Sequence, residues 1–344
     1  MNPVKVSFED SLAKDIVRAG KCLGCGACVI VCPFNCLEYV NEKPHLTKEC
    51  KVCGVCAQAC PQYEWASPKI DSFVFGRIRK PEEEFGIYRR LVVAQAADRE
   101  ILNVCQDGGA VTALLLFALK KGIIDGAIVT KKEHERPFYP CPTIATTAEE
   151  ILQSAGTTYF YSPNILALTE AAEQRKNNVA FVGTPCQIRA IRKMQAMELK
   201  KYVAPLRLLV GLACSECFTY EGLMENHIRG KLGINPRSIK KINVKGKMRV
   251  TLDSGTVSIP LAETKLYARQ NCHFCKDFSS EFADISACGL GLENWTFIII
   301  RTEKGEELFS NAERTGVIKT RSVNGEANAL TLLNKLSRKK RQER

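Results

Sequence analysis

The sequence has 344 residues, of which 45% are hydrophobic and 25% charged, and its formal net charge is +12. This composition is typical of a folded globular protein with two or three domains. No apolar stretch approaches the roughly 18 residues of a membrane span, and no export signal opens the chain, so we expect a cytoplasmic protein.

Two cysteine runs with the same spacing dominate the first sixty residues. Nine of the 17 cysteines lie between residues 22 and 60, which favours metal or redox chemistry over disulfides. Each run reads Cys-x-x-Cys-x-x-Cys-x-x-x-Cys-Pro, and this spacing predicts two [4Fe-4S] clusters that exchange their fourth ligand. The first cluster takes Cys22, Cys25, Cys28 and Cys60, and the second takes Cys50, Cys53, Cys56 and Cys32. A zinc array is the alternative, but it would not require doubled runs with proline.

This part of the sequence resembles the bacterial-type dicluster ferredoxins over residues 15 to 65. We therefore expect residues 1–66 to form a ferredoxin-type domain, with Cys36 as a buried thiol rather than a ligand. Residues 67–91 contain prolines and mixed charges, which indicates a linker across the surface of the next domain.

From residue 92 onward, short runs of apolar residues alternate with segments of helical periodicity, which predicts a larger domain with a mixed α/β fold. Strands are expected over 125–130, 178–186, 206–214 and 296–302, and a helix over 110–122. Before this helix stands "QDGG", where unpaired backbone N–H groups favour an anion such as a pyrophosphate. An ordinary helix cap is the alternative, and the absence of GxGxxG argues against a standard dinucleotide fold.

The segment "SAGTTYFYSPN", residues 154–164, combines hydrogen-bonding groups with three aromatic rings. This mixture suits a ligand that joins a ring system to a polar tail, although an ordinary loop would have the same composition.

Four further cysteines form a third candidate site. Cys186 and Cys214 are expected at the carboxyl ends of two strands, which share one edge of a sheet, and Cys272-x-x-Cys275 completes the set. Zinc, a third cubane cluster and a catalytic dithiol all remain open from spacing alone. Because two clusters precede it, a third cluster that extends the electron path is favoured.

Six ordered segments between about residues 93 and 302 resemble the family of coenzyme F420 hydrogenase/dehydrogenase beta subunits, in particular its dehydrogenase members with a fused dicluster ferredoxin. The matching segments are "CQDGGAVTALL", "GTTYFYSPN", "VGTPCQIRAIRKMQ", "LLVGLACSECF", "NCHFCKDFSSEFADIS" and "WTFIIIRT". Thr158, Met248 and Arg249 depart from the pattern of the family. Cys217 and Cys288 are additional, and we expect both to be inert core thiols.

The resemblance implies an FAD and [4Fe-4S] binding domain over residues 92–325. The cluster would be held by Cys186, Cys214, Cys272 and Cys275. The implied FAD contacts are Gln106, Asp107, Gly108, Gly109, Thr112, Gly156, Thr157, Tyr159, Ser162, Asn164 and Gly291.

The function that the resemblance implies is an oxidoreductase that takes a hydride from reduced coenzyme F420. FAD would divide the electron pair, and three clusters would carry single electrons to ferredoxin or to a larger, membrane-bound complex. The alternatives are the same machinery with a different hydride donor or acceptor, and a non-enzymatic protein that only transfers electrons.

Two groups of basic residues are candidates for binding anions or partners. Arg189, Arg192 and Lys193 would bind the anionic tail of coenzyme F420, unless they form a solvated helix face. The basic C-terminal helix or tail, residues 326–344, would dock on an acidic or membrane-embedded partner and place the protein at the membrane periphery. It lacks the aromatic interleaving of a nucleic-acid site, so no nucleic acid is expected.

Overall fold

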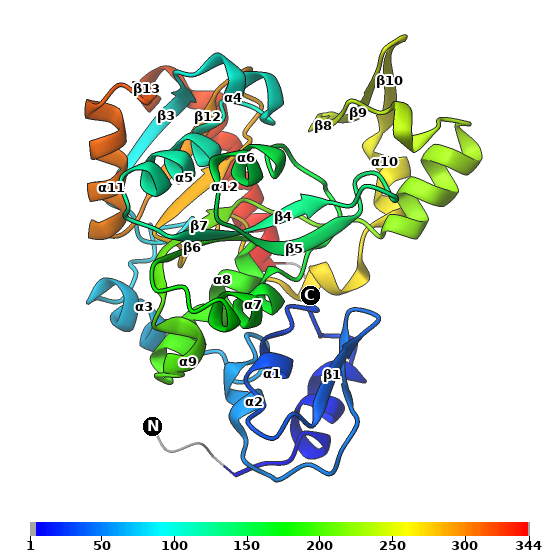
Figure 1. Ribbon diagram of the computed structural model, residues 1–344, viewed down its shortest axis with the longest axis vertical. Coiled ribbons are helices and arrows are strands. Elements are labelled where there is room, and N and C mark those ends of the chain that lie inside the picture. The colour runs from blue at the N-terminus through cyan, green and yellow to red at the C-terminus, as the bar shows by residue number, and fades with distance from the viewer. Residues whose placement is uncertain (1–4, 343–344) are drawn as a thin grey trace.

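The computed structural model describes residues 5–342 and has three parts, an N-terminal segment, a central mixed sheet with helices on both faces, and a small outlying sheet (Figure 1). The N-terminal segment contains η1 (Glu9–Val17), α1 (Ala27–Ile30), β1 (Leu37–Val40), β2 (Lys43–Leu46) and α2 (Val55–Ala59). Its two strands pair antiparallel. Each short helix contains the third cysteine of one run, Cys28 in α1 and Cys56 in α2, and the other cysteines of the runs lie in the adjoining loops.

The central sheet has eight strands and confirms the predicted mixed α/β fold. In spatial order they are β13 (Ile318–Arg321), β3 (Arg90–Ala96), β12 (Thr296–Ile300), β11 (Ile285–Cys288), β7 (Leu206–Leu212), β6 (Val179–Gly183), β4 (Gly126–Lys132) and β5 (Pro140–Ala145). The four strands β11, β7, β6 and β4 run parallel, and the others pair antiparallel. The parallel strands are almost entirely buried because helices cover both faces.

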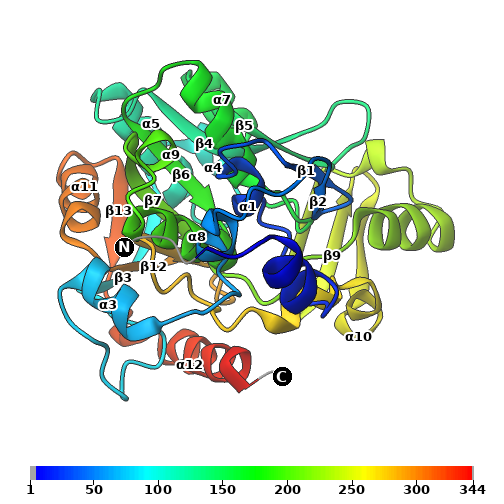
Figure 2. The same cartoon turned by 90° about the horizontal axis from the view of Figure 1, so that it is seen from below.

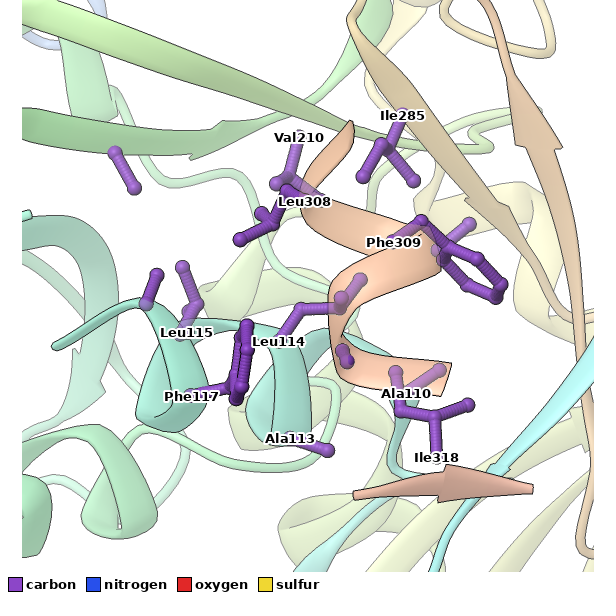
Figure 3. Packing of buried hydrophobic residues seen from close by; sticks show 14 of the residues in the cluster. Ala110, Ala113, Leu114, Leu115, Phe117, Val210, Ile285, Leu308, Phe309 and Ile318 are labelled. Carbon is purple, nitrogen blue, oxygen red and sulfur yellow. The ribbon is translucent and has the colours of Figure 1, made fainter. Parts of the chain in front are cut away.

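One face of the sheet packs against α5 (Ala110–Lys120) and α11 (Glu303–Arg314), with α4 (Arg99–Val104) and α6 (Ala148–Gln153) beside them. Leu114 of α5 and Phe309 of α11 belong to the same buried cluster as Val210 and Ile285 of the strands (Figure 3). The predicted helix over 110–122 is confirmed, and Gly122 follows its end with the positive φ that glycine tolerates.

The opposite face carries α7 (Ala167–Glu173), α8 (Pro185–Ala196), α9 (Lys200–Val203), α3 (Ser67–Phe75) and α12 (Ala327–Gln342). The apolar cluster around α8 includes Ile188 and Ile191, and also Ala27, Ile30 and Ala59 of the N-terminal segment. The N-terminal segment therefore shares a hydrophobic core with α8, and the two lie against each other in both views (Figure 2).

A second, three-stranded antiparallel sheet lies outside the central one and was not anticipated from the sequence. It consists of β8 (Lys241–Lys245), β9 (Lys247–Leu252) and β10 (Gly255–Pro260), and it packs on helix η3 (Glu221–Lys231). Met248, one of the departures from the family pattern, is fully buried in this core, whereas Arg249 on the other side of β9 is exposed.

Shorter elements complete the chain, namely η2 (Asn164–Leu166), η4 (Pro236–Ser238), α10 (Leu261–Thr264), η5 (Lys265–Tyr267), η6 (Gln270–Phe274) and η7 (Val323–Gly325). Among the described residues, no helix has the length and apolar character needed to cross a bilayer.

One expectation about local structure needs correction. The strand expected over 178–186 ends at Gly183, because Thr184 precedes a helix whose first residue is Pro185, a favoured position for proline. Cys186 thus lies in the first turn of α8 and not at a strand end. The segment 67–91, expected to be a linker, contains helix α3, which packs against α8.

The contact between α5 and α11 gives a stability prediction. Leu114→Ala removes a fully buried side chain, and the resulting cavity should destabilise the fold by about 3 kcal/mol. Thermal unfolding of matched preparations measures this loss. Leu266→Ala, at a side chain that is 76% exposed, is the control; equal melting temperatures for both variants would contradict the described core.

Candidate metal and cofactor sites

The four cysteines predicted for the first cluster line a single small cavity. Leu12, Ile16, Val17 and Pro61 are among its other lining residues. The cysteines concerned are Cys22, Cys25, Cys28 and Cys60. Gly26 caps α1 with a φ of 80°, so the backbone turns tightly between two of these thiols. The structure therefore brings the predicted set together.

The second set, Cys32, Cys50, Cys53 and Cys56, gathers beside the first. Burial, and next the neighbouring Cys53, raise the pKa of Cys56 to about 12. The Sγ of Cys50 accepts a hydrogen bond from the Phe8 backbone N–H at 3.3 Å, and the Sγ of Cys32 accepts one from the Cys36 N–H at 3.3 Å. With its pKa raised in this way, the Cys56 thiol is neutral on its own, and metal binding is what would make it a thiolate.

The third set also converges. Cys186 from α8, Cys214 after β7, and Cys272 and Cys275 from η6 and its end line one cavity, together with Tyr161. The Sγ of Cys186 lies 3.3 Å from the Thr184 hydroxyl and 3.9 Å from the Tyr161 hydroxyl. Burial, and next Cys186, raise the pKa of Cys275 to about 12. This donor set fits a cubane cluster.

Cys217 is a fifth thiol in this cavity, although the sequence reasoning treated it as inert. Its Sγ lies 3.8 Å from that of Cys214, and its backbone N–H donates to the Sγ of Cys272 at 3.5 Å. The signal that was overlooked is the Cys-x-x-Cys spacing of residues 214 and 217. By contrast, Cys288 is fully buried in strand β11, as expected of a core thiol.

The first and third cavities are neighbours, and their ligand loops are joined by hydrogen bonds. Leu23 lines both cavities. The Asn271 amide donates to the Cys22 carbonyl, and the Gln62 amide donates to the Phe274 carbonyl at 3.0 Å. Each bond connects the ligand loop of one site to the ligand loop of the other. The two sites are thus fixed relative to each other.

Arg189 and Lys193 of α8 bind the chain around residues 60–65, which contradicts the expectation that they bind a substrate tail. Lys193 Nζ donates to the carbonyls of Cys60 at 2.8 Å and Tyr63 at 2.6 Å. The Arg189 guanidinium lies 4.0 Å from the ring centre of Trp65. Arg192 instead forms a buried ion pair of 2.9 Å with Asp284.

The predicted cofactor residues around "QDGG" form a hydrogen-bonded group of their own, apart from the cysteine sets. Gln106 accepts a bond from the Thr157 N–H at 3.3 Å and donates to the Tyr159 hydroxyl at 3.3 Å. Tyr159 has a φ of 61°, and its hydroxyl accepts from the Val244 N–H at 3.1 Å. A Cβ at Gly289 would lie 3.0 Å from the Asp107 carboxylate, so the turn around Gly289 and Gly291 is adjacent.

Strand β8 adds polar residues that the sequence reasoning missed. Lys241, Asn243 and Lys245 alternate along the strand and so share one face. Lys245 lies 3.1 Å from the Asp107 carboxylate, and Lys241 donates to the Cys105 carbonyl at 3.0 Å. Lys132 of β4 is near, and burial followed by the charge of Lys241 lowers its pKa. Two positive charges beside the start of α5 suit an anionic ligand.

Gly108, Gly109 and Thr112 hold the start of α5 in place. Gly109 has a φ of 69° at the N-cap, and the Gly108 N–H donates to the Thr296 hydroxyl at 3.1 Å. Thr112 is buried in the helix. Gly156 has a φ of 89°, and a Cβ there would lie 3.5 Å from the Lys132 ammonium group.

Ser162 and Asn164 form a separate group of buried hydrogen bonds. The Asn164 amide donates to the Val182 carbonyl at 2.9 Å, and its oxygen accepts from Ser162 at 2.6 Å and from Thr130 at 3.0 Å. Both side chains are buried, and these bonds pin the 154–164 loop to the sheet. Their contact with a cofactor stays a prediction.

Comparisons with known proteins point to one family. Residues 91–169 and 176–326 match the N-terminal and C-terminal models described as "Coenzyme F420 hydrogenase/dehydrogenase, beta subunit", and residues 16–38 match a 4Fe-4S binding domain. The chain is similar to the beta subunit of the coenzyme F420 hydrogenase of Methanothermobacter thermautotrophicus, with 38% identity over 75% of this chain and 93% of the relative. It is also similar to a subunit of the F(420)H(2) dehydrogenase of Methanosarcina mazei, with 31% identity over 86% and 83%. Among solved structures, the F420-reducing [NiFe] hydrogenase complex of Methanosarcina barkeri contains a chain with a TM-score of 0.73, 35% identity and coverage of 77% and 92%.

The contact of α8 with the N-terminal segment is testable by hydrogen exchange. Lys193→Met leaves two carbonyls without their donor, at a cost of about 1–3 kcal/mol for each buried group. Amide exchange in the 53–66 region, followed by mass spectrometry, should become faster. Lys200→Met, at an exposed lysine of α9, should leave it unchanged, and equal exchange in both variants would refute the role of Lys193.

Proposed function

Because the chain belongs to the family of coenzyme F420 hydrogenase/dehydrogenase beta subunits, we propose that it oxidises reduced coenzyme F420 by hydride transfer to a bound FAD and passes single electrons through three [4Fe-4S] clusters. The clusters would deliver the electrons to ferredoxin or to a partner complex. The observation that carries the proposal is the convergence of Cys186, Cys214, Cys272 and Cys275 beside the first cysteine cavity.

The domain division follows from this proposal. Residues 1–66 would bind two clusters, and 92–325 would bind FAD and the third cluster. Residues 67–91 would link these two domains, and 326–344 would be the basic C-terminal helix or tail. The 4Fe-4S domain match and the two cavities support the first and third of these assignments.

The chain's own residues would bind FAD and exclude water from it. Gln106, Thr157 and Tyr159 fix the loop over the start of α5, and Lys241 and Lys245 supply positive charge for a phosphate. FAD supplies the exchange between paired and single electrons that a deazaflavin hydride donor and one-electron clusters require. No protein acid or base is assigned, because hydride transfer does not need one.

Each of the three thiol sets would hold its cluster as thiolates, with the neighbouring peptide N–H groups as donors to sulfur. The hydrogen bonds between the first and third ligand loops support an electron path that needs no domain movement. The second set contains three half-buried cysteines, Cys32, Cys50 and Cys53, and would face the electron acceptor.

Composition and a spectral titration test the whole proposal. Anaerobically prepared protein should contain about twelve irons and one FAD per chain, since each cubane holds four irons. Addition of reduced coenzyme F420 should bleach the flavin absorbance and then that of the clusters. Protein without flavin that still contains its iron would support a role in electron transfer alone, and four bound zinc ions would refute the cluster assignment.

A single variant tests the role assigned to β8. Lys245→Met removes the ammonium group beside Asp107 and should weaken FAD retention about tenfold, as the loss of one charge-assisted hydrogen bond implies. Flavin released during dialysis measures this loss. Lys240→Met is the matched control, because this exposed lysine pairs with Asp253 instead. Equal flavin retention in the two variants would exclude Lys245 from the binding site.

A further inference from the structure

Two buried cations line the cavity of the third cysteine set. The side chain of Arg269 reaches it from the segment before Cys272, and Lys340 reaches it from the last turns of α12. Arg269 is 6% exposed and Lys340 is 5% exposed. Buried cations are rare because desolvation disfavours them, so their placement beside a set of thiols needs an explanation.

Arg269 lies between the first and third cavities. Both terminal nitrogens of its guanidinium donate to the Leu23 carbonyl at 3.3 Å, one residue after Cys22, and the group lies 3.9 Å from the ring centre of Tyr161. Its Nε donates to the Glu42 carboxylate at 2.7 Å. Because the Glu42 side chain is 46% exposed, solvent screens this negative charge more than it screens the arginine.

Lys340 lines the third cavity from the side of α12. Its Nζ donates to the Cys272 carbonyl at 2.7 Å. The adjacent Arg341 pairs with Glu281 at 2.6 Å, and Arg338 donates to Glu84 at 2.8 Å, so the end of α12 is anchored on this chain. The basic C-terminal helix that the sequence suggested for partner docking thus directs part of its charge inward, and its end lies near the N-terminal part (Figure 1).

Besides Glu42, the buried Asp277 is a negative group in this region. Asp277 is buried two residues after Cys275, and its carboxylate accepts from the Glu281 N–H at 2.9 Å. Glu281 is itself neutralised by Arg79 and Arg341. Arg269 and Lys340 line the cavity itself, whereas Asp277 and Glu42 are not among its lining residues.

We propose that Arg269 and Lys340 are positioning residues that stabilise the reduced state of a [4Fe-4S] cluster in the third site, and that Arg269 does the same for the first site. This inference rests on the proposed function for the presence of the clusters. Reduction adds one negative charge to a cluster, and a fixed cation nearby in a poorly screened interior favours that charge.

Redox potentials of the purified holoprotein test this inference directly. In an EPR-monitored titration with dithionite, Lys340→Met should lower the potential of the third cluster alone. Arg269→Gln should lower the potentials of the third and first clusters and leave the second unchanged. We expect about a tenfold change in each reduction equilibrium constant, which is about 59 mV for one electron.

Conservative and control variants separate charge from packing. Arg269→Lys and Lys340→Arg should restore the wild-type potentials within a small shift. Lys335→Met, at an exposed lysine of the same helix, should leave all three potentials unchanged. Shifts of the same size in the redox potentials of Lys335→Met and Lys340→Met would contradict a local effect of Lys340.

A further variant tests the charge effect without changing either cation. Glu42→Gln removes the partly exposed counter-charge of Arg269 and should raise the potentials of the first and third clusters. Unchanged potentials in this variant would overturn the inference for Arg269 even where Arg269→Gln failed to fold. Unchanged potentials in a Lys340→Met variant that keeps its full iron content would overturn the inference for Lys340. Absence of the third cluster from the wild type would refute the proposed function itself.

Discussion

The arrangement of this protein depends on the stabilisation of crowded, buried cysteine thiols as ligands of a metal centre. Burial raises the pKa values of Cys25, Cys28 and Cys275, and neighbouring thiols raise them further. Such groups resist ionisation unless a metal centre takes them as ligands. The peptide N–H groups directed at Cys32 and Cys50, and the cations near Cys60 and Cys272, are features that would stabilise the negative charge of a metal–thiolate group.

Helix α8 sets the geometry between the central sheet and the N-terminal segment. Cys186, Arg189 and Lys193 stand at positions i, i+3 and i+7, and therefore lie on one face of the helix. The first lines the third cavity, whereas the other two bind the backbone of the N-terminal segment around Pro61 and Tyr63. One helix thereby holds a cysteine site and the neighbouring ferredoxin segment at a fixed separation, which suits electron transfer without large motion.

Much of the basic character of the chain acts within the protein rather than on a partner. Lys193 and Arg192 are used in the core contacts of α8, Lys245 lies beside Asp107, and Arg269 and Lys340 border the third cavity. A net charge of +12 counts cysteines as neutral. Clusters with thiolate ligands would offset part of this excess, so the sequence charge overstates the attraction to an acidic partner.

The sequence by itself determined the features that depend on local spacing. The doubled cysteine runs give the first two ligand sets, and the glycines around them permit the tight turns. The apolar pattern gives helix α5 and four of the eight strands of the central sheet, because a buried strand leaves a short apolar run in the sequence. Only the tertiary structure decided which distant residues meet. Cys217 joins the third set, Lys241 and Lys245 of an unanticipated sheet reach "QDGG", and the arginines of α8 turn inward. These contacts join residues that are far apart in the sequence, and such pairings leave no periodic signal in it.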